Sequence, residues 1–119
     1  MQMLHLRGRK RCEVLRTKGI AWKGQHMVVR WMKGRLPSEK VRPEGSIYVG
    51  SFAGAKLDKS AVNRNRMRRR CKEAFRLALA KVDRVMPPTC LLIAPRSSSL
   101  DCAFDALERE ATSFLSTIR

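Results

Sequence analysis

The sequence predicts one α+β domain spanning residues 1–119, a two-layer α/β sandwich with the element order α-β-β-β-α-β-α. Three observations lead to this expectation. The 119 residues fit a single domain, and 44% of them are hydrophobic, which is enough for a buried core. Two long segments repeat apolar residues at helical spacing, and short apolar runs precede and separate them. Helices packed on one small sheet are the layered arrangement that this pattern favours.

The first third of the chain is expected to hold an arm, a helix and one or two strands. Residues 1–8 are predicted to be a flexible arm. Residues 9–18 are predicted to be a short helix, which Gly19 caps at its C-terminal end. The apolar run at 27–32 indicates a strand. Residues 34–46 contain two prolines and two glycines, so they are expected to form a loop.

A further strand is predicted over residues 47–53. Ile47, Val49 and Phe52 are expected to face the core, and Gly50 is interpreted as a β-bulge. The continuous apolar run at 89–94 is typical of a central strand, because such a strand is buried on both faces.

The longest predicted helix covers residues 60–82 and starts near Lys59 or Ser60. At 100° per residue, its apolar residues fall within a stripe of about 100°. This stripe comprises Met67, Cys71, Ala74, Phe75, Ala78 and Val82. The basic residues assigned to the opposite face are Arg66, Arg68, Arg69, Arg70, Lys72 and Arg76. A last helix is expected over 101–118, with Asp101 as its N-cap.

Charge is the dominant feature of the composition. The chain has 26 Lys and Arg against 10 Asp and Glu, a net charge of +16 and a pI near 11.1. Self-repulsion of this size favours a polyanionic partner, with nucleic acid first and an anionic membrane surface second. No apolar run approaches the roughly 20 residues of a membrane span, and the N-terminus does not resemble a signal peptide. A cytoplasmic protein with no membrane partner is therefore expected.

The four cysteines do not predict a metal site or a disulfide framework. Cys12, Cys71, Cys90 and Cys102 form no C-x-x-C pair, and only two histidines could join them. Cys71 and Cys90 lie in apolar patterns, so both are interpreted as buried small hydrophobes in a reducing compartment. No metal bound by the protein itself is expected.

The basic helix carries the strongest functional signal. Residues 56–76 contain nine Lys and Arg against two Asp and Glu, and Arg outnumbers Lys by six to three. Arginine grips phosphate oxygens with a planar fork and stacks on bases. Because like charges at i,i+4 destabilise an isolated helix, the apolar stripe must hold this helix on the sheet while a polyanion covers its outer face. Asn65 could contact a base edge or sugar, or cap the helix.

The block Ala61-Val62-Asn63-Arg64-Asn65-Arg66-Met67-Arg68-Arg69 runs into Lys72-Glu73-Ala74-Phe75-Arg76. It resembles the ribonuclease P protein family, whose signature is A-V-x-R-N-R-x-[KR]-R followed by a basic helix. The resemblance implies a left-handed β-α-β crossover, although the general rule favours right-handed ones.

It also implies two partners, a large catalytic RNA and a precursor tRNA, and no DNA. In such a ribonucleoprotein the RNA, with Mg²⁺, removes the 5′ leader to form the mature tRNA end. The protein assists and has no catalytic residue of its own. A basic ribosomal or other nucleic-acid-binding structural protein is the alternative. A protein-only nuclease is disfavoured, because the acidic residues are scattered and no nucleophile–base pair is evident.

The resemblance assigns two groups of binding residues. The residues expected to contact the catalytic RNA are Lys56, Arg64, Asn65, Arg66, Arg68, Arg69, Arg70 and Lys72. The residues expected to contact the leader, in a cleft between the first helix and the sheet, are Cys12, Arg16, Arg30, Tyr48 and Phe52. Cys12 stands where the family usually has an aromatic residue. The aromatic residues that could replace it are Trp22, Trp31, Tyr48 and Phe52.

Overall fold

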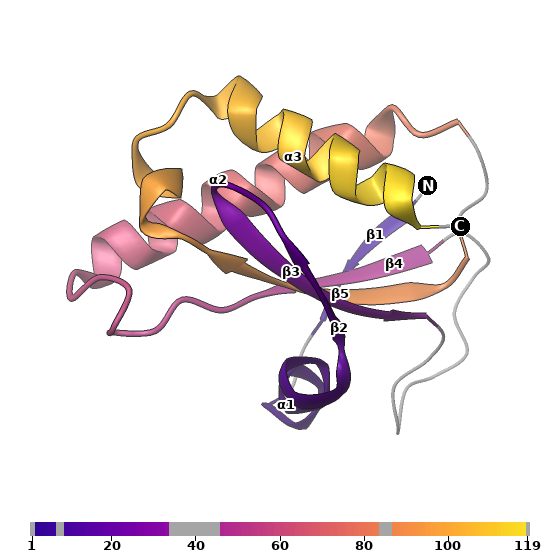
Figure 1. Ribbon diagram of the computed structural model, residues 1–119, viewed down its shortest axis with the longest axis horizontal. Helices are drawn as coiled ribbons and strands as arrows, with labels where there is room; N and C mark the ends of the chain where they lie inside the picture. Colours follow the sequence, from indigo (N-terminus) through magenta and orange to yellow (C-terminus); the bar gives the residue numbers. More distant parts are fainter. Residues whose placement is uncertain (1, 7–8, 34–45, 84–86, 119) are drawn as a thin grey trace.

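The computed structural model describes residues 2–6, 9–33, 46–83 and 87–118 (Figure 1). They form one five-stranded sheet with the strand order β1-β4-β5-β3-β2. The strands are β1 (Gln2–His5), β2 (Ile20–Lys23), β3 (Met27–Lys33), β4 (Ser46–Ser51) and β5 (Thr89–Pro95). The helices are α1 (Arg9–Lys18), α2 (Ala61–Ala80), α3 (Phe104–Thr117) and the short 3₁₀ helix η1 (Ser97–Leu100). From α1 onward this order confirms the predicted α-β-β-β-α-β-α.

The central strand is β5, as its continuous apolar sequence predicts. It runs parallel to β4 and antiparallel to β3, and six of its seven residues are buried. Its side chains alternate between two apolar clusters. Leu91 and Ile93 pack with α2 and α3, whereas Cys90 and Leu92 pack with Leu15 of α1.

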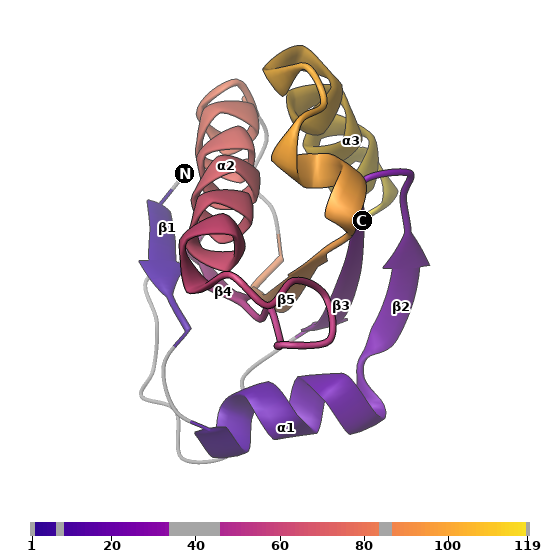
Figure 2. The ribbon, with the colours of Figure 1, turned by 90° about the vertical axis from the view of Figure 1, so that its left-hand side faces the viewer.

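The helices lie on both sides of the sheet (Figure 2). α2 and α3 form the main helical layer, and α1 crosses the opposite face. The larger core therefore lies under α2 and α3. Phe114 is its centre, because the rings of Trp22, Trp31 and Phe75 all meet it edge-on, with centroids 5.6, 6.0 and 5.8 Å away.

The β4-α2-β5 connection is a left-handed crossover. β4 and β5 are parallel neighbours, and α2 joins them above the sheet. In Figure 2 both strands run toward the viewer, and the chain passes from β4 up through α2 and down to β5 on the right. The exceptional hand that the family resemblance implies is confirmed.

The long helix confirms its predicted apolar stripe up to Ala78, whereas Val82 lies beyond the end of α2 at Ala80 and is half-buried against the larger core. Met67, Cys71, Ala74, Phe75 and Ala78 are buried, as is Cys90 in β5. The last helix starts later than predicted, because residues 97–100 form η1 and α3 begins at Phe104. Asp101 is therefore not its N-cap.

Three expectations for the sheet are wrong. Gln2–His5 are not part of an arm but form β1, which pairs in parallel with β4. Gly50 makes no bulge, since β4 continues in unbroken register against β5. A Cβ at Gly50 would lie 3.1 Å from Leu6, so the glycine makes room for the chain that follows β1. Phe52 does not face the core but is 44% exposed. The loop predicted over 34–46 lies, up to residue 45, outside the described residues.

No helix of the described segments is long and apolar enough to cross a membrane.

Candidate nucleic-acid interface

A polar cap fixes the start of α2. The Ser60 hydroxyl accepts a hydrogen bond from the Asn63 backbone N–H at 3.3 Å. The Asp58 carboxylate accepts one from the Ser60 backbone N–H at 2.8 Å and one from the Asn63 side chain at 3.1 Å. These bonds satisfy donors that the first turn of a helix leaves unpaired, and they hold the preceding turn in place.

Arg64 belongs partly to this cap. Its guanidinium donates to the backbone carbonyl oxygens of Asp58 at 2.8 Å and Lys59 at 3.2 Å. Arg64 therefore shapes the N-terminal end of the basic helix, and its charge stays at the surface there. Lys56, in the turn before the helix, is exposed.

The outer face of α2, defined here as Asn65, Arg66, Arg68, Arg69 and Lys72, presents cationic groups to solvent. Arg66 and Arg69 are exposed, and Arg68 and Lys72 are half-buried. The Asn65 side-chain oxygen accepts a hydrogen bond from the Arg68 guanidinium, so Asn65 orients a cation. Four of the five predicted residues, with Ser51 of β4, line a hollow of about 350 Å³. Guanidinium and ammonium groups around such a hollow suit a phosphate group.

Arg70 corrects the prediction, since it does not share the outer face. It is half-buried, and its guanidinium donates to three backbone carbonyl oxygens of the connection between β5 and α3. One turn further on, Glu73 and Arg76 pair with each other at 2.5 Å on the solvent side. The hydrogen bonds from Arg76 lower the pKa of the Glu73 carboxyl. Counted from the start of α2, Glu73 is the first acidic residue on the exposed side of the helix.

The five residues predicted to bind a leader do share the α1 side of the sheet. Cys12 and Tyr48 pack against the smaller apolar cluster beneath α1. Arg30 pairs with Leu92 in the β3–β5 register and so points to the same face. The Arg16 guanidinium lies over the Phe52 ring, 4.6 Å from its centroid. We call these residues the α1-side surface.

Cys12 is half-buried there. Burial raises the pKa of its thiol, and the nearby Arg16 guanidinium partly offsets this effect. The neutral thiol therefore predominates near neutral pH, and the positive charge of this surface comes from Arg16 and Arg30.

The structure separates the aromatic candidates. Trp22 and Trp31 contact Phe114, so they belong to the opposite face of the sheet. Tyr48 is half-buried. All seven aromatic residues of the chain lie in described segments, and Phe52 is the one that is exposed. An exposed ring with an arginine over it can stack with a nucleobase.

Sequence reasoning missed Ser51 and the Asp58–Asn63 cap. The spacing of Ser60 and Asn63 within a run that starts at Asp58 is a readable capping signal, because a short polar side chain commonly precedes a helix. Ser51 carried no such signal, since only the parallel pairing of the sheet brings β4 beside α2. Within the described residues, no group of three or more His, Cys, Asp or Glu is placed to hold a metal ion.

Fold and surface together define a class: small basic α+β proteins with an arginine-rich crossover helix on one side of the sheet and a cationic, partly aromatic surface on the other. Comparison with known proteins narrows that class. A sequence model of the Ribonuclease P family matches residues 2–119. Because this match spans almost the whole chain, the chain belongs to the ribonuclease P protein family.

Individual relatives agree with this assignment. The ribonuclease P protein component of Synechococcus sp. (strain RCC307) is 37% identical over 76 residues, which cover 64% of this chain and 57% of that protein. The match thus spans little more than half of that relative's length. The RNase P protein from Thermotoga maritima has a TM-score of 0.72 at 18% identity over 97% of both chains. The Staphylococcus aureus protein has a TM-score of 0.69 at 15% identity, covering 96% of this chain and 95% of that chain. These two structures establish the shared fold.

Proposed function

We propose that this chain is the protein subunit of ribonuclease P and assists the removal of the 5′ leader from precursor tRNA. The outer face of α2 is the observation that carries the proposal. It presents several cations on a rigid helix whose apolar stripe is buried in the core. A surface of this kind binds a folded polyanion without having to order flexible side chains on a loop.

The proposed partner of the outer face is the catalytic RNA. Arg66 and Arg69 are exposed and can reach phosphate oxygens, and the hollow beside Ser51 can take up a phosphate next to Arg68 and Lys72. Arg64 and Lys56 extend the positive surface beyond the helix start. RNA rather than DNA is proposed, in line with the family to which the chain belongs.

The proposed partner of the α1-side surface is the single-stranded leader of the precursor tRNA. Arg16 and Arg30 supply charge for the leader backbone, and Phe52 supplies a ring on which a base stacks. The family usually has an aromatic residue at the position of Cys12. Phe52 supplies the aromatic ring instead. The two partners then bind opposite sides of one sheet, so the protein holds the leader while it is anchored on the RNA.

Chemistry belongs to the RNA in this proposal. The described residues offer no metal-holding group of three acidic, histidine or cysteine side chains. In line with the family to which the chain belongs, the proposal assigns the Mg²⁺ of the complete ribonucleoprotein and the cleavage step to the RNA. The proposed location is the cytoplasm.

Binding measurements test whether the protein binds the leader while it is bound to the catalytic RNA. The RNA subunit is titrated with precursor tRNA and with mature tRNA, each with and without the protein. We expect the protein to tighten binding of the precursor and to leave the affinity for mature tRNA almost unchanged. Equal tightening of both substrates would contradict leader binding, and no association of the protein with the RNA subunit would contradict the proposal as a whole.

A further inference from the structure

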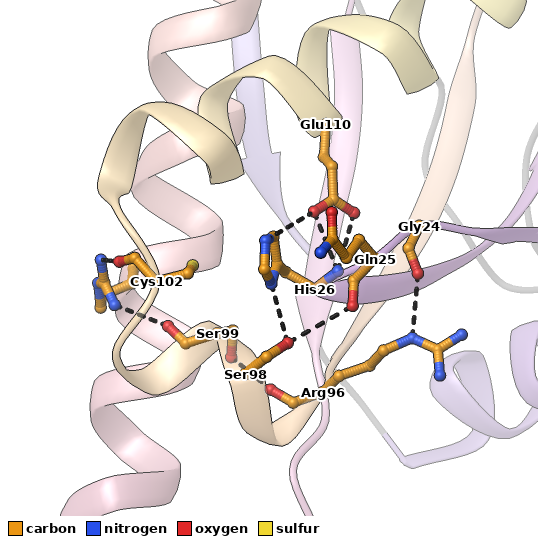
Figure 3. A network of polar contacts seen from close by, with 9 residues as sticks. Gly24, Gln25, His26, Arg96, Ser98, Ser99, Cys102 and Glu110 are labelled. Carbon is orange, nitrogen blue, oxygen red and sulfur yellow. Dashed lines mark hydrogen bonds and ion pairs between the residues drawn. The ribbon is translucent and has the colours of Figure 1, made fainter.

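A network of polar contacts ties three separate parts of the fold together beside α2 (Figure 3). Its members come from the turn between β2 and β3, from η1 and the residues on either side of it, and from α3. Arg70 joins this network to α2. Its Nη1 donates to the Ser99 carbonyl oxygen at 2.7 Å and the Leu100 carbonyl oxygen at 2.6 Å, and its Nη2 donates to the Cys102 carbonyl oxygen at 2.5 Å.

These three acceptors are well matched to a guanidinium. Ser99 and Leu100 end η1, and the last carbonyl groups of a helix have no partner within it. Ser99 is fully buried, so its carbonyl oxygen would lose its donor if the guanidinium left, and solvent could not replace that donor. The planar fork of arginine can address several oxygens at once, whereas a lysine ammonium is a single compact charge.

The segment that Arg70 holds is itself anchored. The Ser98 hydroxyl lies 2.8 Å from His26 Nδ1, and the Arg96 side chain donates to the Gly24 carbonyl oxygen at 3.0 Å. Both oxygens of Glu110 accept from the His26 backbone N–H, at 3.1 and 3.0 Å. Arg70 therefore fastens α2 to a unit that includes the β2–β3 turn and α3.

We infer that Arg70 is a positioning residue, which contacts no RNA although it stands inside the arginine run. It fixes α2 against the β5–α3 connection and so holds Arg66 and Arg69 where they can meet phosphates. We call the three hydrogen bonds that Arg70 donates the clamp. The effect of the clamp on RNA binding rests on the proposed function, but the clamp itself is independent of any partner. A phosphate could recruit Arg70 only by stripping three carbonyl oxygens of their donor, at least one of them on a buried residue.

Two charge-preserving substitutions test the clamp in the full-length protein. Arg70→Lys keeps the charge but loses the fork, and Arg69→Lys is the matched control on the neighbouring exposed position. Amide hydrogen exchange is followed at Cys102, whose backbone N–H donates to the Ser98 carbonyl oxygen at 3.1 Å. We expect exchange at least about tenfold faster in Arg70→Lys, together with a lower Tm, and unchanged values in Arg69→Lys. Equal exchange and equal Tm in the two variants would overturn the inference.

The salt dependence of binding to the RNA subunit tests the absence of a phosphate contact. Arg69→Ala should reduce the slope of log K against log salt concentration by about 0.7 to 0.9. Arg70→Ala should weaken binding at every salt concentration and leave the slope unchanged. An equal reduction of the slope in both variants would show that Arg70 meets a phosphate. If Arg70→Ala does not fold, amide exchange and Tm of the Arg70→Lys variant decide whether Arg70 positions α2.

Failure of the proposed function can be distinguished from failure of the inference about Arg70. If the unmodified protein shows no salt-dependent affinity for the RNA subunit, the proposed function fails, whereas exchange and Tm in Arg70→Lys still decide whether the clamp exists.

Discussion

Replacing Phe52 by alanine should weaken binding of the leader and of nothing else. The ring is 44% exposed and has Arg16 over it at 4.6 Å, so a base can use the ring without disturbing the core. Stacking on an aromatic side chain contributes about 1–3 kcal/mol per base. One base lost corresponds to an affinity roughly 5- to 150-fold lower. The Arg16 contact adds only about 0.5–1 kcal/mol at an exposed site, so the folded state should tolerate the change.

The assay compares precursor tRNA with mature tRNA on the assembled ribonucleoprotein. Phe52→Ala should lower the affinity for the precursor alone, and Phe52→Tyr should restore it because it keeps the ring. Equal losses for both substrates, or full affinity for the precursor in Phe52→Ala, would refute the reasoning. In the opposite direction, Cys12→Phe adds a further ring to the α1-side surface and should tighten precursor binding. Unchanged affinity would argue against a leader near α1.

Four further outcomes are expected. For about six phosphate contacts, the slope of log K against log salt concentration for RNA binding should be near −4 to −5. The double variant Arg66→Ala, Arg69→Ala should reduce the size of this slope by about 1.4 to 1.8, and an unchanged slope would exclude these arginines from the interface. Gly24→Ala should destabilise the fold by about 1–3 kcal/mol in urea denaturation, because the new Cβ would collide with the Glu110 carboxylate and lie 2.7 Å from the Trp22 ring; stability equal to that of the parent protein would contradict this packing. Burial raises the pKa of Cys71 from 9.0 to about 12, so the native thiol should resist alkylation at pH 8, as measured by mass spectrometry. Because the folded state then holds a proton that the unfolded state releases, this thiol should lower stability as the pH rises above about 9.

Local patterns predicted the helices and the central strand. The stripe from Met67 to Ala78 has helical period, and the run at 89–94 is apolar on both faces, so each element follows from neighbouring residues. Strand β1 could not be predicted in this way. It has four residues, and only its parallel pairing with β4, more than 40 residues away, makes it a strand. The left-handed crossover likewise has no local signal and came from the family resemblance alone.

The binding surfaces could be predicted only in part, because a sequence pattern gives local information alone. A helical pattern shows which residues lie on one face but not what each side chain meets. At 100° per residue, Arg70 lies only about 40° from buried Ala74, which already places it at the border of the apolar stripe. Its partners after Ser98 come from 29 to 32 residues away, so only the folded chain reveals them. An alternating strand with Ile47 and Val49 in the core puts Phe52 on the other face, so a core position for Phe52 requires a bulge at Gly50. Strand β4 has no bulge and ends at Ser51, and Phe52 is exposed.

The most direct test of the central claim is cleavage of a precursor tRNA by the RNA subunit at low Mg²⁺, with and without this protein. We expect that the protein alone cuts nothing, that the RNA alone cuts slowly, and that the two together cut faster at the 5′ end of the mature tRNA. Cleavage by the protein alone, or no stimulation of the RNA, would contradict it.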